Sequence, residues 1–408
     1  MTTAVVRPAH PPTTRSAVHA APWTPIVAAA ALLAVARIAA AGTATFDRVW
    51  AEDGAVFYTD TADGAAAFGR TYAGYLHTIP RAVASLAVHV APPTAFGATV
   101  LALAVLVTAG CAAAIYTSLA ARTGPVPGAT VALLLVGVPA AGVESLGNAA
   151  NLQFFMLTAL CVAVTRPAAA GSAARWAAAG AGFLVAASCP LAAVAVPVAV
   201  ISCGRRGGLR HPLVRGIAAG LVVQAAAVTW GAASGFVNPQ RPTGGWQASR
   251  LLGVLEQRGL PIAPVAAGAV VGLAAVVAAT WVVTRSCEHR RMVWALLVAA
   301  LLLAVVPVAL AGRPGARYEL APTVLVAAAV ALWAVRRRRA VLWAVVGVAV
   351  VAAAVGFPAG QSRVAGPSWS QQIAAHDRAC AAGQRPAAVG WSPPSWAATE
   401  LPCPTPPG

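Results

Sequence analysis

The residues best suited to chemistry in this sequence are two adjacent carboxylates, Glu52 and Asp53, in the segment Trp50–Gly54. The chain has only 11 acidic residues, and five of them lie between positions 47 and 63. Adjacent carboxylates repel each other, so one of the two takes a raised pKa where the site is dry. Such a group can act as a general base or hold a divalent metal ion. A solvated acidic loop or a helix N-terminal cap is the alternative interpretation.

Aromatic and basic residues follow in the same segment, at Tyr75, His77 and Arg81. His77 and Arg81 are four positions apart, so they share one face if the segment is helical, and together they can bind a phosphate. Tyr75 can line a groove for a sugar or a prenyl chain. Aromatic residues also anchor helices at a membrane interface, and the sequence leaves both roles open.

A second polar group, Glu144, Asn148, Asn151 and Gln153, lies at a turn between two apolar stretches. Side-chain amides in this position can bind the hydroxyl groups of a sugar. They can equally cap helices or join neighbouring helices by hydrogen bonds. Both interpretations place these residues close to the ends of two predicted membrane helices.

The elements that position all these residues are apolar. The 408-residue chain is 59% hydrophobic and 10% charged, whereas soluble domains carry about 25% charged residues. A soluble fold cannot bury so much apolar surface, so lipid is expected to surround much of the chain. The net charge of +17 comes from arginines between apolar stretches. We therefore expect contact with membrane lipid and no nucleic-acid partner.

The hydropathy pattern predicts an all-α, polytopic membrane protein with about eleven transmembrane helices. The transmembrane bundle is predicted between residues 23 and 357, after a disordered cytoplasmic N-terminus at 1–22. Within it, residues 44–81 form a predicted extracytoplasmic loop and residues 82–90 a predicted interfacial helix. Residues 358–408 are predicted to be an extracytoplasmic tail.

Arginine distribution predicts the orientation, because short cytoplasmic loops carry an excess of positive charge. With the N-terminus inside and the C-terminus outside, the inner side receives sixteen arginines and one acid. The outer side receives eleven arginines and ten acids. The chain around Cys189 and Pro190 forms either two short helices or one kinked helix. Only the first alternative keeps the run Arg336–Arg339 on the inner side.

Two groups of residues gain significance from this orientation. Arg313, Arg317 and Tyr318 fall in a short outer loop, where the positive-inside rule disfavours arginine. Two arginines four positions apart beside the membrane suit a phosphate or pyrophosphate group. Cys380 and Cys403 fall in the outer tail, where an oxidising environment favours a disulfide over two free thiols.

The order of these features resembles the GT-C class of membrane glycosyltransferases, in which a first span precedes an outer loop with an acidic pair and many further spans. The segments Trp50–Gly54, Tyr72–Tyr75 and Pro80–Arg81 are similar to those of uncharacterised bacterial membrane proteins of polysaccharide assembly. This resemblance implies a polyprenyl-phosphate-linked sugar as donor and a glycan or protein as acceptor. It also implies transfer at the outer face of a bacterial plasma membrane.

The resemblance further implies that Asp53 or Glu52 is the base that deprotonates the acceptor, or a ligand of a metal ion. Arg81, Arg313 and Arg317 would stabilise the departing lipid phosphate. The chain departs from the class because it lacks a C-terminal carbohydrate-binding domain and a second acidic motif. A transporter or flippase for a lipid-linked glycan, or a non-catalytic assembly protein, is the alternative. Few ionisable residues lie within the predicted spans, which disfavours ion-coupled transport.

Overall fold

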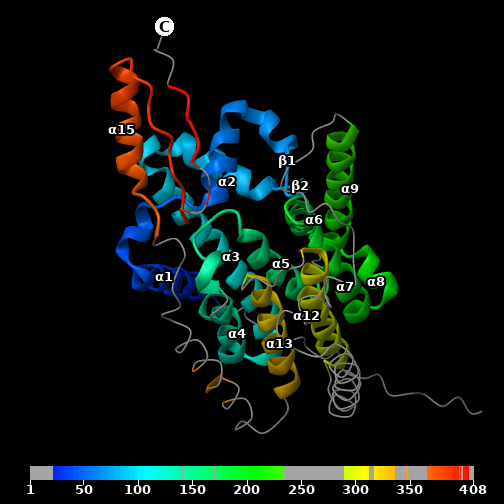
Figure 1. Ribbon diagram of the computed structural model, residues 1–408. Coiled ribbons are helices and arrows are strands. Elements are labelled where there is room, and N and C mark those ends of the chain that lie inside the picture. Colours follow the sequence, from blue (N-terminus) through cyan, green and yellow to red (C-terminus); the bar gives the residue numbers. More distant parts are fainter. Residues whose placement is uncertain are drawn as a thin grey trace, which may run out of the picture.

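The computed structural model is all-α apart from one short hairpin (Figure 1). It describes residues 22–138, 141–168, 171–233, 289–311, 317–335, 365–394, 396 and 398–403, together with the isolated positions 343, 346, 347 and 351. Arg313 and nearly all of the predicted N-terminal segment at 1–22 lie outside these residues, as do parts of the predicted transmembrane bundle.

Among the described residues, four helical stretches are long and apolar enough to cross a membrane, by length and composition. An 18-residue helix is about 27 Å long, close to the roughly 30 Å of a bilayer core. The all-α membrane class is therefore supported, while the count of eleven spans stays a prediction. The four are α1 (Thr24–Ala41), η4 (Pro93–Ala95) with α3 (Phe96–Thr123), α9 (Pro212–Ala233) over Pro212–Trp230, and α13 (Arg317–Ala334).

The other α-helices, and the 3-10 helix η6, are not among these four stretches. Some of them are apolar, and α2 and α15 belong to the polar end of the molecule that carries the candidate site. They are α2 (Thr78–Val90), α4 (Pro125–Gly137), α5 (Leu152–Ala163), α6 (Ser172–Ala186), η6 (Pro190–Val194), α7 (Ala195–Cys203), α8 (Arg205–Arg210), α12 (Arg290–Ala311) and α15 (Trp369–Ala381).

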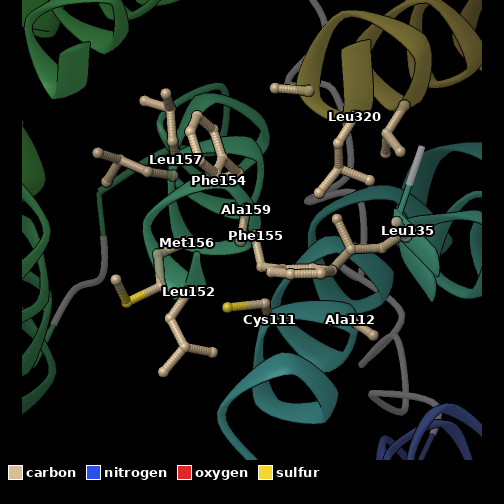
Figure 2. Packing of buried hydrophobic residues seen from close by; sticks show 14 of the residues in the cluster. Cys111, Ala112, Leu135, Leu152, Phe154, Phe155, Met156, Leu157, Ala159 and Leu320 are labelled. Atoms are coloured by element: carbon tan, nitrogen blue, oxygen red, sulfur yellow. The ribbon is translucent and has the colours of Figure 1, made fainter. Parts of the chain in front are cut away.

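Helix α5 lies in the core of the bundle, and every residue from Leu152 to Val162 is buried. Figure 2 shows Phe155 of α5 extending toward Leu135 of α4, beside Cys111 and Ala112 of α3. A helix of this length is too short to cross a bilayer perpendicularly. Its complete burial among other helices explains why a short helix is tolerated here.

Helices α6 and α9 run parallel, because Ala179 faces Gly216 and Ala187 faces Gly220 further along both helices. The chain must return between two parallel neighbours, and η6 with α7 makes that return. The thiol of Cys203 at the end of α7 lies 3.6 Å from the carbonyl oxygen of Val164, just past α5. Cys189 is extended, with φ −151° and ψ 111°. The chain therefore reverses at Cys189 and forms two segments, not one kinked helix.

The connections between helices gather at two ends of the bundle. At one end, the Arg122 guanidinium lies 3.4 Å from the Thr165 carbonyl oxygen, and His211 contacts the Arg166 carbonyl oxygen at 3.1 Å. At the other end, the Thr78 hydroxyl donates to the Ala187 carbonyl oxygen at 2.9 Å. These contacts place Arg122, Thr165 and His211 at one end of the described bundle, and Thr78 and Ala187 at the other. The membrane face that each end occupies stays a prediction.

The segment predicted as a loop at 44–81 is largely helical, which corrects its expected local structure. It contains η1 (Thr43–Asp47), η2 (Asp53–Tyr58), which is a π-helical turn, and η3 (Thr61–Gly69). A hairpin of β1 (Thr71–Tyr72) and β2 (Tyr75–Leu76) follows. A hydropathy pattern predicts the segments that contact lipid. It does not predict these short helices, because they lie outside the long apolar stretches.

The predicted interfacial helix at 82–90 begins earlier, because α2 starts at Thr78. Pro80 lies in the first turn of α2, where the N–H that proline lacks would have no helical partner in any case. Helix α2 buries Val83, Ala84 and Ala87 and exposes Leu86 and Val90. This two-sided character is consistent with the predicted interfacial position.

Candidate functional site

The two adjacent carboxylates have different surroundings. Asp53 is 1% exposed, and its Oδ2 and Oδ1 accept hydrogen bonds from the backbone amides of Ala149 and Ala150 at 3.0 and 2.8 Å. Hydrogen bonds to a charged acceptor are stronger than neutral ones. Asp53 therefore ties the start of η2 to the turn that precedes α5.

Glu52 is partly buried, and its Oε2 is a buried atom that has no hydrogen-bond partner among the described residues. Burial raises the pKa of Glu52, the backbone amide of Glu52, the charge of Arg317 and the Trp50 side chain lower it in part, and the nearby Glu144 raises it further. A carboxylate with a raised pKa and an uncommitted oxygen is suited to proton transfer.

Arg317, the first residue of α13, interacts electrostatically with both Glu52 and Glu144. Its NH1 is 3.6 Å from Oε2 of Glu144, and its guanidinium lies 5.4 Å from the centre of the Tyr318 ring. Glu144 belongs to η5 (Ala141–Ser145), which is a π-helical turn. Asp53 likewise lies in a π-helical turn, η2. Such turns are frequent at functional sites. The structure thus brings Glu52, Glu144 and Arg317 together from three distant segments.

Aromatic and amide side chains surround this charged group. Burial, followed by the charge of Glu52, raises the pKa of Tyr72, so its hydroxyl stays protonated. Tyr318 meets the edge of Phe154 at 5.2 Å, and the Tyr75 hydroxyl donates to Gln153 Oε1 at 3.1 Å. The sequence places Tyr72 and Gln153 in the two polar groups without singling them out as site residues. It gives no signal for Phe154, which is one apolar residue within an apolar stretch.

The hairpin that carries Tyr72 and Tyr75 is held by α9. Its turn residues Ala73 and Gly74 have φ of 49° and 86°, as a two-residue hairpin turn requires. The Gln224 side chain accepts from the Leu76 amide at 2.8 Å and donates to the Leu76 carbonyl at 3.2 Å. Gln224 thereby replaces a neighbouring strand and fixes the hairpin to the bundle.

His77 and Arg81, predicted to share a phosphate, have other partners. His77 is stacked on Tyr75 with ring centres 4.1 Å apart, and burial, together with the charge of Arg81, lowers its pKa to about 3. It is neutral near pH 7. Arg81 is 2% exposed and donates to Asp60 Oδ2 at 2.6 Å, with its guanidinium 5.5 Å from the Phe57 ring centre. No described contact joins Arg81 to Glu52.

Asn148 and Asn151 build the turn between η5 and α5. The side-chain amide groups of both asparagines donate to the Glu144 carbonyl oxygen. The Asn148 Oδ1 accepts from the backbone N–H of Asn151 at 2.9 Å. The two asparagines shape the segment that presents the Ala149 and Ala150 amides to Asp53. The hydrogen bonds described for the two asparagines are thus made within the turn, and their contact with a sugar stays a prediction.

The predicted metal role of Glu52 and Asp53 finds no supporting ligand set among the described residues. Both oxygens of Asp53 already accept backbone N–H groups. Within the described part of the chain, the one group of three ligand side chains close enough for a metal is His376, Cys380 and Cys403. Those two cysteines are joined by the predicted disulfide, with a Cα–Cα distance of 5.5 Å.

Comparisons with protein-family models, curated proteins and solved structures find no match to this chain. The resemblance to GT-C glycosyltransferases thus rests on the short motifs of the first 81 residues and on the predicted topology. Any function must be argued from the site itself.

Proposed function

We propose that this protein is a polytopic membrane glycosyltransferase that moves a sugar from a polyprenyl-phosphate donor to an extracytoplasmic glycan or protein acceptor. The proposal includes about eleven spans, an inner N-terminus, an outer C-terminus and a bacterial plasma membrane. One observation carries it: Glu52, which has a raised pKa and a buried oxygen without a hydrogen-bond partner in the described part of the chain, lies near the Arg317–Glu144 ion pair.

In the proposed reaction, the Glu52 carboxylate takes the proton from the acceptor hydroxyl. The acceptor oxygen then forms a bond to the anomeric carbon of the sugar, and the bond from that carbon to the phosphate oxygen breaks. The lipid phosphate leaves with the electron pair. Arg317 stabilises the negative charge on the departing phosphate. Atoms and charge balance without a further reactant.

Glu144 and Asp53 have supporting roles in this proposal. Glu144 lies 3.6 Å from Arg317 and orients its guanidinium. Asp53 is assigned to positioning and not to proton transfer, because both of its oxygens accept backbone hydrogen bonds. Tyr72, Tyr318 and Phe154 supply aromatic surface of the kind that packs on sugar rings and prenyl chains.

The test is Glu52→Gln, which preserves shape and removes the proton acceptor. We expect normal amounts of folded protein and a loss of sugar transfer of about 100-fold or more, as for other general bases. In the parent protein, transfer should rise with pH as Glu52 loses its proton. The measurement is sugar transfer from a polyprenyl-phosphate sugar in membranes, with envelope glycan composition in cells.

Asp63→Asn is the matched control, because Asp63 is an exposed acid of the same segment that pairs with Arg70 at 2.6 Å. It should retain transfer. If folded Glu52→Gln protein leaves every envelope glycan and the transfer rate unchanged, the protein is not this enzyme. Transfer that persists while movement of a lipid-linked glycan across the membrane fails would identify a flippase instead.

A further inference from the structure

The C-terminal tail contacts the backbone of the segment that carries Glu52. The Ser392 amide donates to the Val49 carbonyl oxygen at 3.0 Å, and the Ser392 carbonyl oxygen accepts from the Ala51 amide at 2.9 Å. These two bonds make a short parallel bridge between Trp50 and Ser392. The tail thus holds the backbone of Ala51, the residue immediately before Glu52.

Trp391 contacts the same segment on the other side of Glu52. A Cβ atom at Gly54 would lie 2.1 Å from two atoms of the Trp391 indole ring, so only glycine permits this approach. The Trp391 N–H donates to the Thr399 hydroxyl at 3.1 Å, and Trp369 stacks on its ring at 5.7 Å. The indole is therefore fixed within the tail.

The tail is itself anchored to the first loop and to the bundle. The Trp369 N–H donates to the Pro93 carbonyl oxygen at 2.7 Å. Asp47 accepts from the Ser370 amide at 2.9 Å and from the hydroxyls of Ser368 and Ser370. Burial alone would raise the pKa of Asp47, but these hydrogen bonds outweigh it and lower that pKa. The disulfide Cys380–Cys403 closes the tail.

We infer that Trp391 and Ser392 are positioning residues that fix the backbone around Glu52 and thereby set its carboxylate relative to Arg317. Ala51 is bound by the tail and Asp53 by the turn before α5, so both neighbours of Glu52 are held while its own Oε2 is uncommitted. A catalytic group needs this kind of support to be placed within about 0.5 Å. The catalytic meaning of this inference rests on the proposed function, whereas the placement of Glu52 does not.

A change in the position of Glu52 alters its titration, because Arg317, Glu144 and Tyr72 surround it with charges and dipoles. A hydrophobic carbodiimide reacts with protonated carboxyl groups, so the yield of labelled Glu52, measured by mass spectrometry against pH, reports its titration. With the purified full-length protein in detergent, Trp391→Ala should shift the labelling midpoint by about one pH unit. Trp391→Phe should restore most of the original midpoint.

Arg385→Ala is the matched control in the tail, since Arg385 forms an exposed ion pair with Glu400 at 2.5 Å, away from Glu52. Its midpoint should equal that of the parent protein. An unchanged midpoint in folded Trp391→Ala protein overturns the inference. A shifted midpoint in a protein whose Glu52→Gln variant still transfers sugar would overturn the proposed function and leave the positioning role standing.

A second measurement decides the matter if Trp391→Ala does not fold. In the Cys380→Ser, Cys403→Ser protein the tail is no longer closed, and the amides of residues 49–54 should exchange hydrogen about tenfold faster. Exchange at 49–54 that stays at the rate of the parent protein overturns the inference. The same samples can be labelled with carbodiimide, so both readouts come from one preparation.

Discussion

Two tightly packed regions of this protein use different side chains. The α6–α9 pair is joined through glycines: a Cβ at Gly216 would lie 1.9 Å from the Ala179 carbonyl oxygen, and one at Gly220 would lie 2.6 Å from that of Phe183. The loop–tail junction, formed by residues 47–58 and 365–403, instead packs large rings such as Trp369 and Trp391 and is closed by a disulfide.

The difference follows from the solvent. Lipid chains are as apolar as leucine, so helices in a bilayer gain little from burying large apolar side chains and associate through close backbone contact. Outside the hydrocarbon core, water makes the burial of aromatic rings favourable. This contrast is the one expected if α6 and α9 lie in lipid and the loop–tail junction lies in water, and both placements stay predictions.

Within the polar end a second contrast separates Asp53 from Glu52. Both carboxylate oxygens of Asp53 accept hydrogen bonds from backbone amides, whereas the Oε2 of Glu52 is buried and has no hydrogen bond to any residue that the structure describes. A buried polar atom without a partner costs about 1–3 kcal/mol. Neighbouring residues of the same type thus divide into one that holds the structure and one that is available for chemistry.

The largest expected effect tests the helix pair. Gly216→Val should separate α6 from α9, because the new side chain would overlap the Ala179 carbonyl, and we expect a loss of about 3 kcal/mol or more. The measurement is the yield and thermal stability of monodisperse protein in detergent. Gly180→Val is the control, since a Cβ at Gly180 meets nothing within 4 Å. Equal stability of the two variants would contradict glycine-mediated packing.

Asp53→Ala tests the second contrast, and its effect should be on stability. The change removes two hydrogen bonds to a charged acceptor and leaves the amides of Ala149 and Ala150 buried, at a cost of about 2–4 kcal/mol. Asp63→Ala, at the exposed acid paired with Arg70, should cost less than about 1 kcal/mol. Denaturant unfolding of both proteins checks this. A fully stable Asp53→Ala protein without transfer activity would return Asp53 to a direct role in catalysis.

Hydropathy and charge predicted the all-α membrane class, which four apolar helices among the described residues support, whereas the number of spans and their orientation stay predictions. They also placed Glu144 and Arg317 on one side, where the structure shows them paired at 3.6 Å. The partners of Asp53 could not be predicted, because backbone amides are the same at every position and leave no sequence signal. The contact of Trp391 with Gly54 joins residues far apart in the chain, so local patterns do not report it.

A smaller effect distinguishes the aromatic cluster around His77 from a phosphate site. The His77 pKa is about 3 in the folded protein and about 6.5 when unfolded. The unfolded state therefore binds the proton more readily, and stability should fall as pH drops below about 6.5, by up to about 2 kcal/mol at pH 5. His77→Phe keeps an aromatic ring and should remove this fall. Unfolding measured at pH 7.5 and pH 5 checks it, and a variant with the same acid sensitivity as the parent would show that His77 is not the cause.

The smallest expected effect concerns the surface of the loop–tail junction. Arg385 and Glu400 form an ion pair at 2.5 Å with side chains 80% and 66% exposed. Water screens such pairs, so Arg385→Ala, Glu400→Ala and the double variant should each lie within about 0.5 kcal/mol of the parent protein in a double-mutant cycle. A coupling well above 1 kcal/mol would mean that surface charge helps to close the tail. Coupling near zero would leave the buried indoles, Asp47 and the disulfide as the groups that hold the tail against Glu52.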